Sequence, residues 1–288
     1  MYYLAIVSLI WAFSFGLIGN ALAGIDSIFA ATTRLGIAGI IFLPFFRASK
    51  VPPNSAIRLL LCGAFQFGVM YVCYMQAFQY LPSHLVALFS ILTPLYIVLI
   101  NDFRRRHCHH QYLFGAILSI AGAAIIKVKT VETSSIWIGF ALMQGAGLAF
   151  GYGQIYYRDW KRSHPEVKDH QVFALLYIGG FLIAAIASAI FTNWDNTQLS
   201  KQQALVLVYL GVVASGFGFF FWNKGASLSK AGTLAAFNNA VVPLAMFCSL
   251  FVFGEISQVT GDALLRLTLG GACILGALLV TEKSPGKS

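Results

Sequence analysis

The sequence predicts an all-α integral membrane protein whose ten transmembrane helices form two inverted five-helix repeats. Three observations lead to this prediction. The 288 residues are 58% hydrophobic and only 10% charged, whereas about a quarter of the residues in a soluble domain are charged. Apolar stretches of roughly twenty residues, long enough to cross a bilayer as helices, follow one another with short connections. A similar proline-containing pattern occurs in both halves of the chain.

The apolar stretches divide the chain into ten expected spans. The first begins at Tyr3 without a basic segment before it and is too long for the apolar part of a signal peptide, so we expect it to be retained. The ten spans are Tyr3–Ala23, Ile28–Phe46, Ile57–Phe78, Ser83–Ile100, Tyr112–Val128, Ile136–Tyr157, Val172–Phe191, Ala204–Asn223, Ala231–Phe253 and Leu264–Val280.

Lysine and arginine fix the expected orientation. With the N-terminus in the cytoplasm, nearly all the basic loop residues fall on the cytoplasmic side, and only Lys127, Lys129 and Lys201 fall outside. Cytoplasmic loops carry an excess of basic residues in membrane proteins. Both termini are therefore expected in the cytoplasm, and the net charge of +9 indicates membrane topology, not binding of nucleic acid.

An internal repeat centres on two prolines. Shifting the chain by 149 residues places Pro94 on Pro243 and Ser90 on Asn239, together with several leucines and alanines. Proline has no N–H, so the carbonyl four residues before it loses its helical partner. A polar side chain beside a freed carbonyl at membrane depth is costly unless it faces a cavity or other protein. The two helices are therefore expected to line a site.

The repeat predicts two domains, residues 1–130 and 131–288, with five spans each. Five is an odd number, so the second domain enters the membrane in the opposite direction to the first. Inverted repeats of this kind place a binding site near the middle of the membrane and are typical of secondary transporters.

Each half of the chain carries several short sequence marks in a definite order. In the first half they are Trp11-Ala12, Arg34, Ala77, Pro94, Gln111, Gly115 and Gly122. In the second half they are Ala226, Pro243, Gly254-Glu255, Gly270 and Gly276. With these marks the chain resembles the EamA family of the drug/metabolite transporter superfamily, as two copies at about 4–127 and 137–281. It departs from the family at Asn101-Asp102, where Gly-Glu is common, and at Leu148-Ala149, where Trp-Ala is common.

The resemblance implies a transporter of the bacterial inner membrane, often an exporter, of amino acids or other small metabolites. A carrier of larger metabolites such as nucleotides or cofactors is the alternative within the superfamily. It should hold several basic residues in its cavity, and Arg34 and Arg266 are the only cations that lie more than one residue inside the ends of the expected spans. A membrane-embedded sensor that transports nothing is the alternative from another class.

Candidate substrate-binding residues are of three kinds. Asn238, Asn239 and Ser90 accompany the two prolines, although they could instead hold neighbouring helices together as hydrogen-bonding polar groups. Arg34 could clamp a substrate carboxylate through two hydrogen bonds, or it could reach the membrane interface or pair with carbonyls at a helix end.

The third kind is aromatic or amide-bearing. In the family the first, third, sixth and eighth helices surround the central cavity, and an aromatic box there could hold an apolar group or an amine. Ordinary packing and interfacial belts of aromatic residues are the alternative. The candidates on these helices are Trp11, Phe15, Tyr71, Tyr74, Gln144, Tyr152 and Trp222.

Other kinds of chemistry find little support in the sequence. The run His107-Cys108-His109-His110 has metal-ligand residue types but no second matching cluster, so a basic loop at the membrane surface is expected and no metal site. No phosphate-binding glycine loop and no nucleophile with a matched base is present, so neither direct ATP hydrolysis nor another enzyme activity is expected. The expected partners are a small-molecule substrate and the lipid bilayer, with no cofactor and no nucleic acid, and a monomer is favoured.

Overall fold

The computed structural model describes residues 2–106 and 133–254 and, beyond these, only single positions between 110 and 121 and between 261 and 276. Within these residues it contains helices and no strand, which confirms the all-α prediction. Eight helical segments are long and apolar enough to cross a membrane. They match eight of the expected spans, while the expected spans Tyr112–Val128 and Leu264–Val280 lie outside the continuously described residues.

Several of the spans consist of more than one helical segment. In the first half the segments are α1 (Tyr2–Ala21), α2 (Ser27–Phe42), η1 (Leu43–Phe45), η2 (Ala48–Lys50), α3 (Ser55–Gly63), η3 (Ala64–Val69), α4 (Met70–Ala77), α5 (Ser83–Phe89), η4 (Ser90–Leu92) and α6 (Thr93–Arg105). In the second half they are α8 (Thr133–Ser163), α9 (Asp169–Phe191), η5 (Trp194–Thr197), α10 (Lys201–Tyr209), η6 (Leu210–Phe217), α11 (Gly218–Ser227), α12 (Ala231–Phe247) and η7 (Cys248–Val252).

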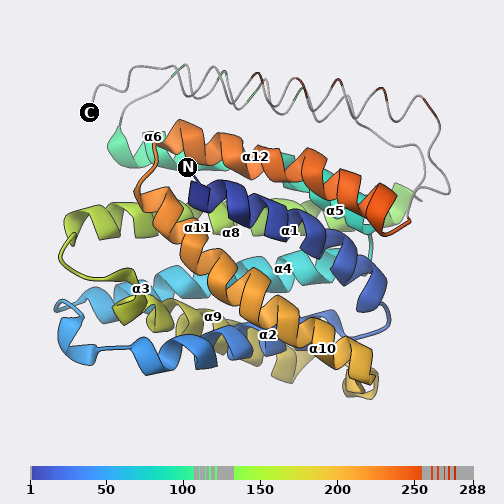
Figure 1. Cartoon of the computed structure of the whole chain (residues 1–288), viewed down its shortest axis with the longest axis horizontal. Coiled ribbons are helices and arrows are strands. Elements are labelled where there is room, and N and C mark those ends of the chain that lie inside the picture. Colours follow the sequence, from blue (N-terminus) through green and yellow to red (C-terminus); the bar gives the residue numbers. More distant parts are fainter. Residues whose placement is uncertain are drawn as a thin grey trace.

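The helices from the two halves of the chain are interleaved (Figure 1). In the first half, α1 packs against α11 and α12, and α4 and α6 pack against α8. α9 packs against α2 and α3. The space between the helices of one half is therefore filled by helices of the other, so a central site is built from both.

Asp26 joins two helices at one end of the bundle. One of its carboxylate oxygens accepts hydrogen bonds from the backbone N–H groups of Ile28 and Phe29, at 3.0 and 2.8 Å, and thus caps the start of α2. An acidic side chain is favourable there because the first N–H groups of a helix have no partner inside it. The same carboxylate accepts from the Thr192 hydroxyl at 3.2 Å and from the Asn193 N–H at 3.1 Å, so it also holds the end of α9.

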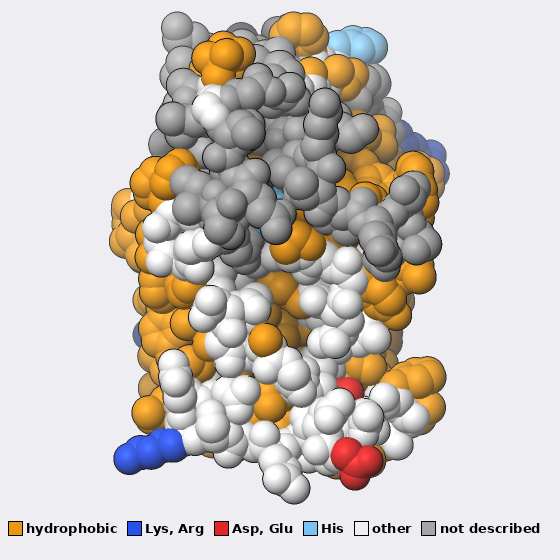
Figure 2. All heavy atoms as spheres, turned by 90° about the vertical axis from the view of Figure 1, so that its right-hand side faces the viewer, with side chains coloured by type: hydrophobic (Ala, Val, Ile, Leu, Met, Phe, Trp, Pro, Cys, Tyr) orange, Lys and Arg blue, Asp and Glu red, His pale blue; other side chains and the backbone are white. Residues whose placement is uncertain are grey.

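The two ends of the bundle differ in charge. We call the end on the left of Figure 1 the basic end, because α6, α8 and α11 reach it with Arg104, Arg105, Arg162 and Lys224 in their last turns. Figure 2 looks at the other end, where hydrophobic side chains, other uncharged side chains and backbone make up most of the described surface. The excess of basic side chains at one end agrees with the sequence, where most basic loop residues are expected on one side of the membrane.

The two prolines of the repeat act differently on the backbone. Pro94 stands in the first turn of α6, where a missing N–H costs nothing, and a tight 3₁₀ turn, η4, precedes it. Pro243 lies inside α12, which continues through it as an α-helix. The wider turn η7 follows α12 at Cys248–Val252. The equivalence of the prolines in sequence therefore does not extend to the local backbone, because only Pro94 coincides with a helix start.

A different pair of features is similar in the two halves. η3 in the third described span and η6 in the seventh are both wider turns of the π-helical kind. Each follows or contains a glycine at a close helix contact. A Cβ on Gly63 would lie 1.9 Å from the carbonyl oxygen of Leu176 in α9, and one on Gly211 would lie 2.8 Å from the Ile37 Cβ in α2. Only glycine allows helices to approach so closely.

Candidate functional site

A central cavity of about 100 Å³ lies between helices of both halves. Most of the lining residues lie in the central half of their spans, so the cavity lies near the middle of the bundle. The described lining residues are Trp11, Ser14, Phe15, Arg34, Met70, Tyr71, Tyr74, Ser90, Thr93, Met143, Ala146, Gly147, Phe150, Phe219, Asn238 and Val241.

Arg34 of α2 is the cation among these residues, and its side chain is 2% exposed. Its Nη2 donates to the Tyr71 hydroxyl at 2.8 Å and its Nε donates to Ser215 Oγ at 3.2 Å. The guanidinium also lies 4.7 Å from the centre of the Tyr71 ring. The ion pairs found among the described residues do not include Arg34.

A buried charge is costly unless it is paired, and neutral hydroxyls offset only part of that cost. Neutral partners therefore hold the Arg34 guanidinium in place, and no carboxylate of the described residues pairs with it. Since a guanidinium matches a carboxylate through two parallel hydrogen bonds, the cavity is suited to an anionic ligand.

Ser215 holds Arg34 in place from η6. The Ser215 hydroxyl contacts both Arg34 and the Tyr71 hydroxyl, the latter at 2.8 Å. Its backbone carbonyl and that of Gly216 accept hydrogen bonds from the Tyr177 hydroxyl, at 2.9 and 2.6 Å. The wider turn of η6 thus presents carbonyls sideways, and Tyr177 satisfies them. Ser215 is not among the residues predicted from the sequence, because a lone serine in an apolar span gives no signal.

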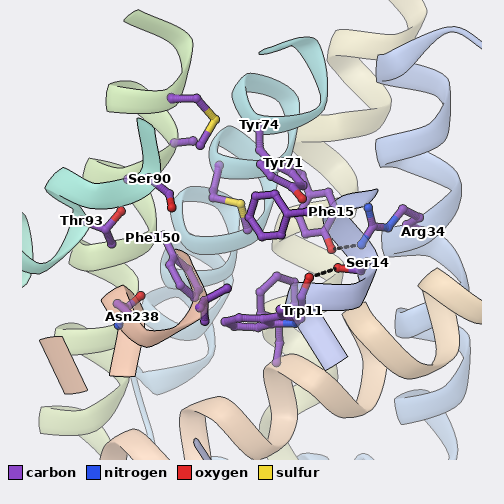
Figure 3. A pocket seen from close by; sticks show the side chains of 16 residues that line it. Trp11, Ser14, Phe15, Arg34, Tyr71, Tyr74, Ser90, Thr93, Phe150 and Asn238 are labelled. Atoms are coloured by element: carbon purple, nitrogen blue, oxygen red, sulfur yellow. Dashed lines mark hydrogen bonds between the residues drawn. The ribbon is translucent and has the colours of Figure 1, made fainter. Parts of the chain in front are cut away.

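Aromatic rings form the middle of the cavity (Figure 3). The Trp11 indole N–H donates to the Ala214 carbonyl at 2.8 Å, which fixes the ring. Phe150 and Phe219 meet Trp11 edge-on, with ring centres 5.6 and 5.2 Å away. Phe15 packs edge-on against Tyr74, with ring centres 5.4 Å apart. These rings offer a rigid apolar surface to a ligand.

Neutral polar groups lie on the side of the cavity opposite Arg34, where Figure 3 shows Ser90, Thr93 and Asn238. The Ser90 hydroxyl donates to the Ala87 carbonyl at 2.7 Å, and its oxygen can accept a further bond. The Asn238 amide nitrogen donates to the Gln154 side-chain oxygen at 3.1 Å and to the Leu234 carbonyl at 2.9 Å. Hydrogen-bonding groups without charge therefore face Arg34 across the aromatic rings.

Seven of the sequence-derived candidates line the cavity. They are Trp11, Phe15, Arg34, Tyr71, Tyr74, Ser90 and Asn238. Four others are not among its described lining residues. The Trp222 ring lies 4.6 Å from that of Trp11, centre to centre, and its N–H donates to Gln154 at 3.0 Å. Gln144 donates to the Phe89 and Phe140 carbonyls, both at 3.2 Å, and so supports η4.

Tyr152 and Asn239 are also placed away from the lining. Tyr152 is 37% exposed and stacks on Tyr156. Asn239 is fully buried, and among the described residues neither its amide nitrogen nor its amide oxygen has a hydrogen-bond partner. Adjacent residues on a helix point about 100° apart, and Asn239 is turned away from the lining to which Asn238 belongs.

Several lining residues were not selected from the sequence. Thr93, Phe150 and Phe219 lie on helices where other residues were chosen, and Met70 and Met143 read as ordinary core. Residues three or four positions from Tyr71 or Trp11 lie on the same helix face, but this spacing identifies lining residues only when the inward face of each helix is known. That face is set by packing between the halves.

The fold and the cavity are those of a membrane transporter. The chain belongs to the EamA-like transporter family, whose model matches residues 1–128 and 167–281. It is therefore a multi-pass membrane protein that acts as a transporter and not as an enzyme.

Named relatives cover nearly the whole chain. A "Probable biotin transporter" of Pseudomonas aeruginosa is 39% identical over 284 residues, 98% of this chain and 97% of the relative. The "Biotin transporter" of Escherichia coli is 40% identical over 254 residues, 88% of this chain and 84% of the relative. A "Probable terminal-alkyne amino-acid exporter" of Streptantibioticus cattleyicolor is 23% identical and covers 96% of this chain and 91% of its own.

A solved structure shares the fold. It aligns with a TM-score of 0.73 over 96% of this chain and 94% of its own, at 17% sequence identity. At that identity the similarity concerns the arrangement of helices alone.

Proposed function

We propose that this protein is a secondary transporter that carries biotin, or a monocarboxylate closely similar to it, across the bacterial inner membrane. The observation that carries the proposal is the order of groups across the cavity. A buried guanidinium lies on one side, neutral hydroxyl and amide groups lie on the other, and aromatic rings lie between them (Figure 3). Biotin has the same order of groups: a carboxylate on an aliphatic chain, an apolar ring and a neutral ureido group.

Each part of biotin has a matching part of the cavity. The carboxylate would take the place of Tyr71 and Ser215 as partner of Arg34, forming charge-assisted hydrogen bonds in a site shielded from water. Trp11 and Phe150 would contact the ring and the chain. The ureido group has both N–H donors and a carbonyl acceptor, which suit the hydroxyl and amide groups opposite.

The charge of the lining favours a cofactor of this kind over the other substrates considered. No carboxylate is present among the described lining residues to pair with the ammonium of an amino acid. One guanidinium matches one carboxylate and not the several charges of a nucleotide. The relatives named as biotin transporters, at 39–40% identity, support the same choice.

Export of an amino acid is the second candidate. The observation in its favour is the ring of aromatic side chains, because a Trp or Phe face attracts an ammonium group. The 23% identical relative named as an amino-acid exporter gives it weaker support.

The architecture proposed for transport is ten helices in two inverted repeats, within residues 1–130 and 131–288. The separate matches of the family model to residues 1–128 and 167–281 support two copies. The paired contacts support the same view, because Gly63 meets a helix of the second half and Gly211 meets one of the first. Such halves can rock against each other and expose the cavity to each side in turn.

The basic end is proposed to face the cytoplasm, with both termini there, because basic loops are retained on that side. A periplasm-dependent enzyme such as alkaline phosphatase fused after Ser288 should then be inactive. Strong activity of that fusion would reverse the orientation.

The direct test is uptake by purified protein in liposomes. Labelled biotin should accumulate or exchange, unlabelled biotin should compete, and biotinamide, which lacks the charge, should compete poorly. Competition by amino acids but not by biotin would favour the second candidate. No flux of either class, with specific binding of another molecule, would contradict transport of both.

A further inference from the structure

A polar stripe on α8 continues from the cavity toward the basic end. Gly147 lines the cavity, and Gly151, Gln154 and Arg158 follow at spacings of three or four residues, so they lie on one side of the helix. Gln154 is fully buried and Arg158 is 1% exposed. Buried polar side chains within membrane spans are rare and usually lie on the path of a substrate or ion.

Two amide pairs lie along this stripe, and we call their four side chains the amide column. In the first pair, Gln154 donates to the Asn238 oxygen at 3.4 Å and accepts from the Asn238 nitrogen at 3.1 Å. In the second, Gln66 of η3 donates to the Asn223 oxygen of α11 at 3.0 Å. All four side chains are 0–9% exposed.

The two amide pairs are next to each other. A Cβ on Gly153, the neighbour of Gln154, would lie 2.1 Å from the Gln66 Cβ. Trp222, the neighbour of Asn223, donates its indole N–H to Gln154 at 3.0 Å. The column thus begins at Asn238 in the cavity lining and joins three helical segments besides α12.

A side-chain contact closes the stripe at the basic end. Arg158 Nη2 donates to the Asn101 oxygen on α6 at 2.7 Å and to an oxygen of Asp159 at 2.9 Å. The other oxygen of Asp159 accepts from Arg104 at 3.3 Å. The Arg158–Asn101 contact links the two halves of the chain across the stripe, and beyond it lie the exposed arginines of the basic end.

Amides paired with one another have a specific property. Gln154 and Asn238 each supply a donor and an acceptor to the other, while Gln66 donates to Asn223, whose nitrogen donates to the Phe219 carbonyl at 3.0 Å. All four buried side chains of the closed column are therefore hydrogen-bonded. A ureido group also supplies N–H donors and a carbonyl acceptor. It can therefore take the place of one amide in a pair without leaving the other unsatisfied, whereas an apolar group cannot.

We propose that the amide column is a second subsite, on the basic-end side of the central cavity, which receives the ureido group of biotin when the Arg158–Asn101 contact opens. The identity of this ligand rests on the proposed function. The central cavity binds the substrate first, and the column accepts its neutral head as the substrate moves toward the basic end.

Cys62 is a natural probe of this opening. It is 1% exposed, and its thiol donates to the Gly153 carbonyl at 3.6 Å and to the Gln66 oxygen at 3.9 Å. A variant that keeps only this cysteine requires four alanine substitutions. They are Cys73→Ala, Cys108→Ala, Cys248→Ala and Cys273→Ala.

The test measures alkylation of Cys62 by N-ethylmaleimide, which crosses membranes, in liposomes whose biotin flux is measured in parallel. Saturating biotin should speed the labelling about tenfold, because labelling follows the open population and the substrate favours that state. Arg158→Gln should speed labelling without biotin. A matched variant that keeps only Cys248, near the far end of α12, should show no such increase.

The outcomes separate the two proposals. Biotin flux with no change in Cys62 labelling would overturn the subsite and leave the proposed function in place. Absence of both biotin binding and biotin flux would overturn both proposals.

A second variant tests the hydrogen-bonding chemistry of the amide column and leaves the Arg158–Asn101 contact intact. Gln66→Leu combined with Asn223→Leu removes both members of a pair, which avoids leaving one amide unsatisfied. Melting temperature and biotin affinity should be unchanged, while flux falls at least about tenfold, a rise of about 1.4 kcal/mol in the barrier. The paired control, Ser83→Ala with Ser249→Ala, removes a buried contact of 3.2 Å toward the other end and should keep normal flux. Normal flux in the leucine pair would also overturn the subsite.

Discussion

Replacement of Arg34 by glutamine tests the charge that the substrate site is built around. Arg34 is 2% exposed, and its hydrogen-bond partners among the described residues are neutral. The carboxylate of a bound substrate would therefore supply the opposite charge that Arg34 lacks. Hydrogen bonds to charged groups contribute about 1.5–3 kcal/mol. Arg34→Gln should therefore weaken biotin binding about 10- to 150-fold, since 1.4 kcal/mol is tenfold in affinity.

The assay compares biotin with biotinamide, which differs by loss of the negative charge. Wild-type protein should bind biotin about 10- to 150-fold more tightly than biotinamide, the range set by the same charge-assisted bonds. Arg34→Gln should bind the two ligands almost equally. Arg34→Lys should fall between, because an ammonium keeps the charge and loses the two-pronged geometry.

The control is Arg47→Gln. Arg47 follows α2, and within the described residues its guanidinium donates to the exposed carbonyls of Pro44 and Phe46. Its loss should leave the preference for biotin unchanged. If Arg34→Gln keeps the full preference for biotin over biotinamide, the carboxylate does not bind Arg34 and the assignment of the two sides of the cavity is wrong.

Three further predictions follow from single contacts. Asn239→Leu removes two buried amide atoms that have no partner in the described part of the chain, each of which costs about 1–3 kcal/mol, so the melting temperature should rise; a fall would show that Asn239 is paired. Gly63→Ala should lower stability by about 1–3 kcal/mol, since its Cβ would meet the Leu176 backbone, whereas Gly39→Ala should be tolerated; equal yields of folded protein would contradict this. Pro94→Ala should leave the melting temperature nearly unchanged, because a missing N–H costs nothing in the first turn of α6, and should reduce flux by letting η4 become regular α-helix; loss of both, with melting temperature and liposome flux measured together, would indicate a packing role instead.

Much of the fold is visible in the sequence because a bilayer imposes a simple rule. A helix that crosses the membrane must satisfy its own backbone hydrogen bonds and present apolar side chains over about twenty residues, so length and hydropathy reveal the spans. All eight expected spans within the described ranges correspond to helices. The charge difference between the two ends is visible for a related reason, because basic loops mark one side of the membrane.

The candidate site was visible in part. Arg34 stands out because a cation inside a span is expensive, and Ser90 and Asn238 stand out because they accompany prolines. The same proline rule also selected Asn239, which is buried outside the lining, because the rule identifies a helix but not one of its faces. Trp222 and Gln144 were chosen as aromatic or amide residues on the expected helices, and they support the cavity from behind.

The sequence by itself determined that this protein spans the membrane many times, which segments do so, and that Arg34 lies inside one of them. Tertiary structure alone decided which side of each helix faces the cavity. It also decided that Ser215 holds Arg34 and that Gln66 meets Asn223. The physical reason is that hydropathy along a membrane helix is nearly uniform around its circumference, since lipid and protein interior are equally apolar. The inward face is therefore set by packing against the other half of the chain, through contacts between residues more than a hundred positions apart.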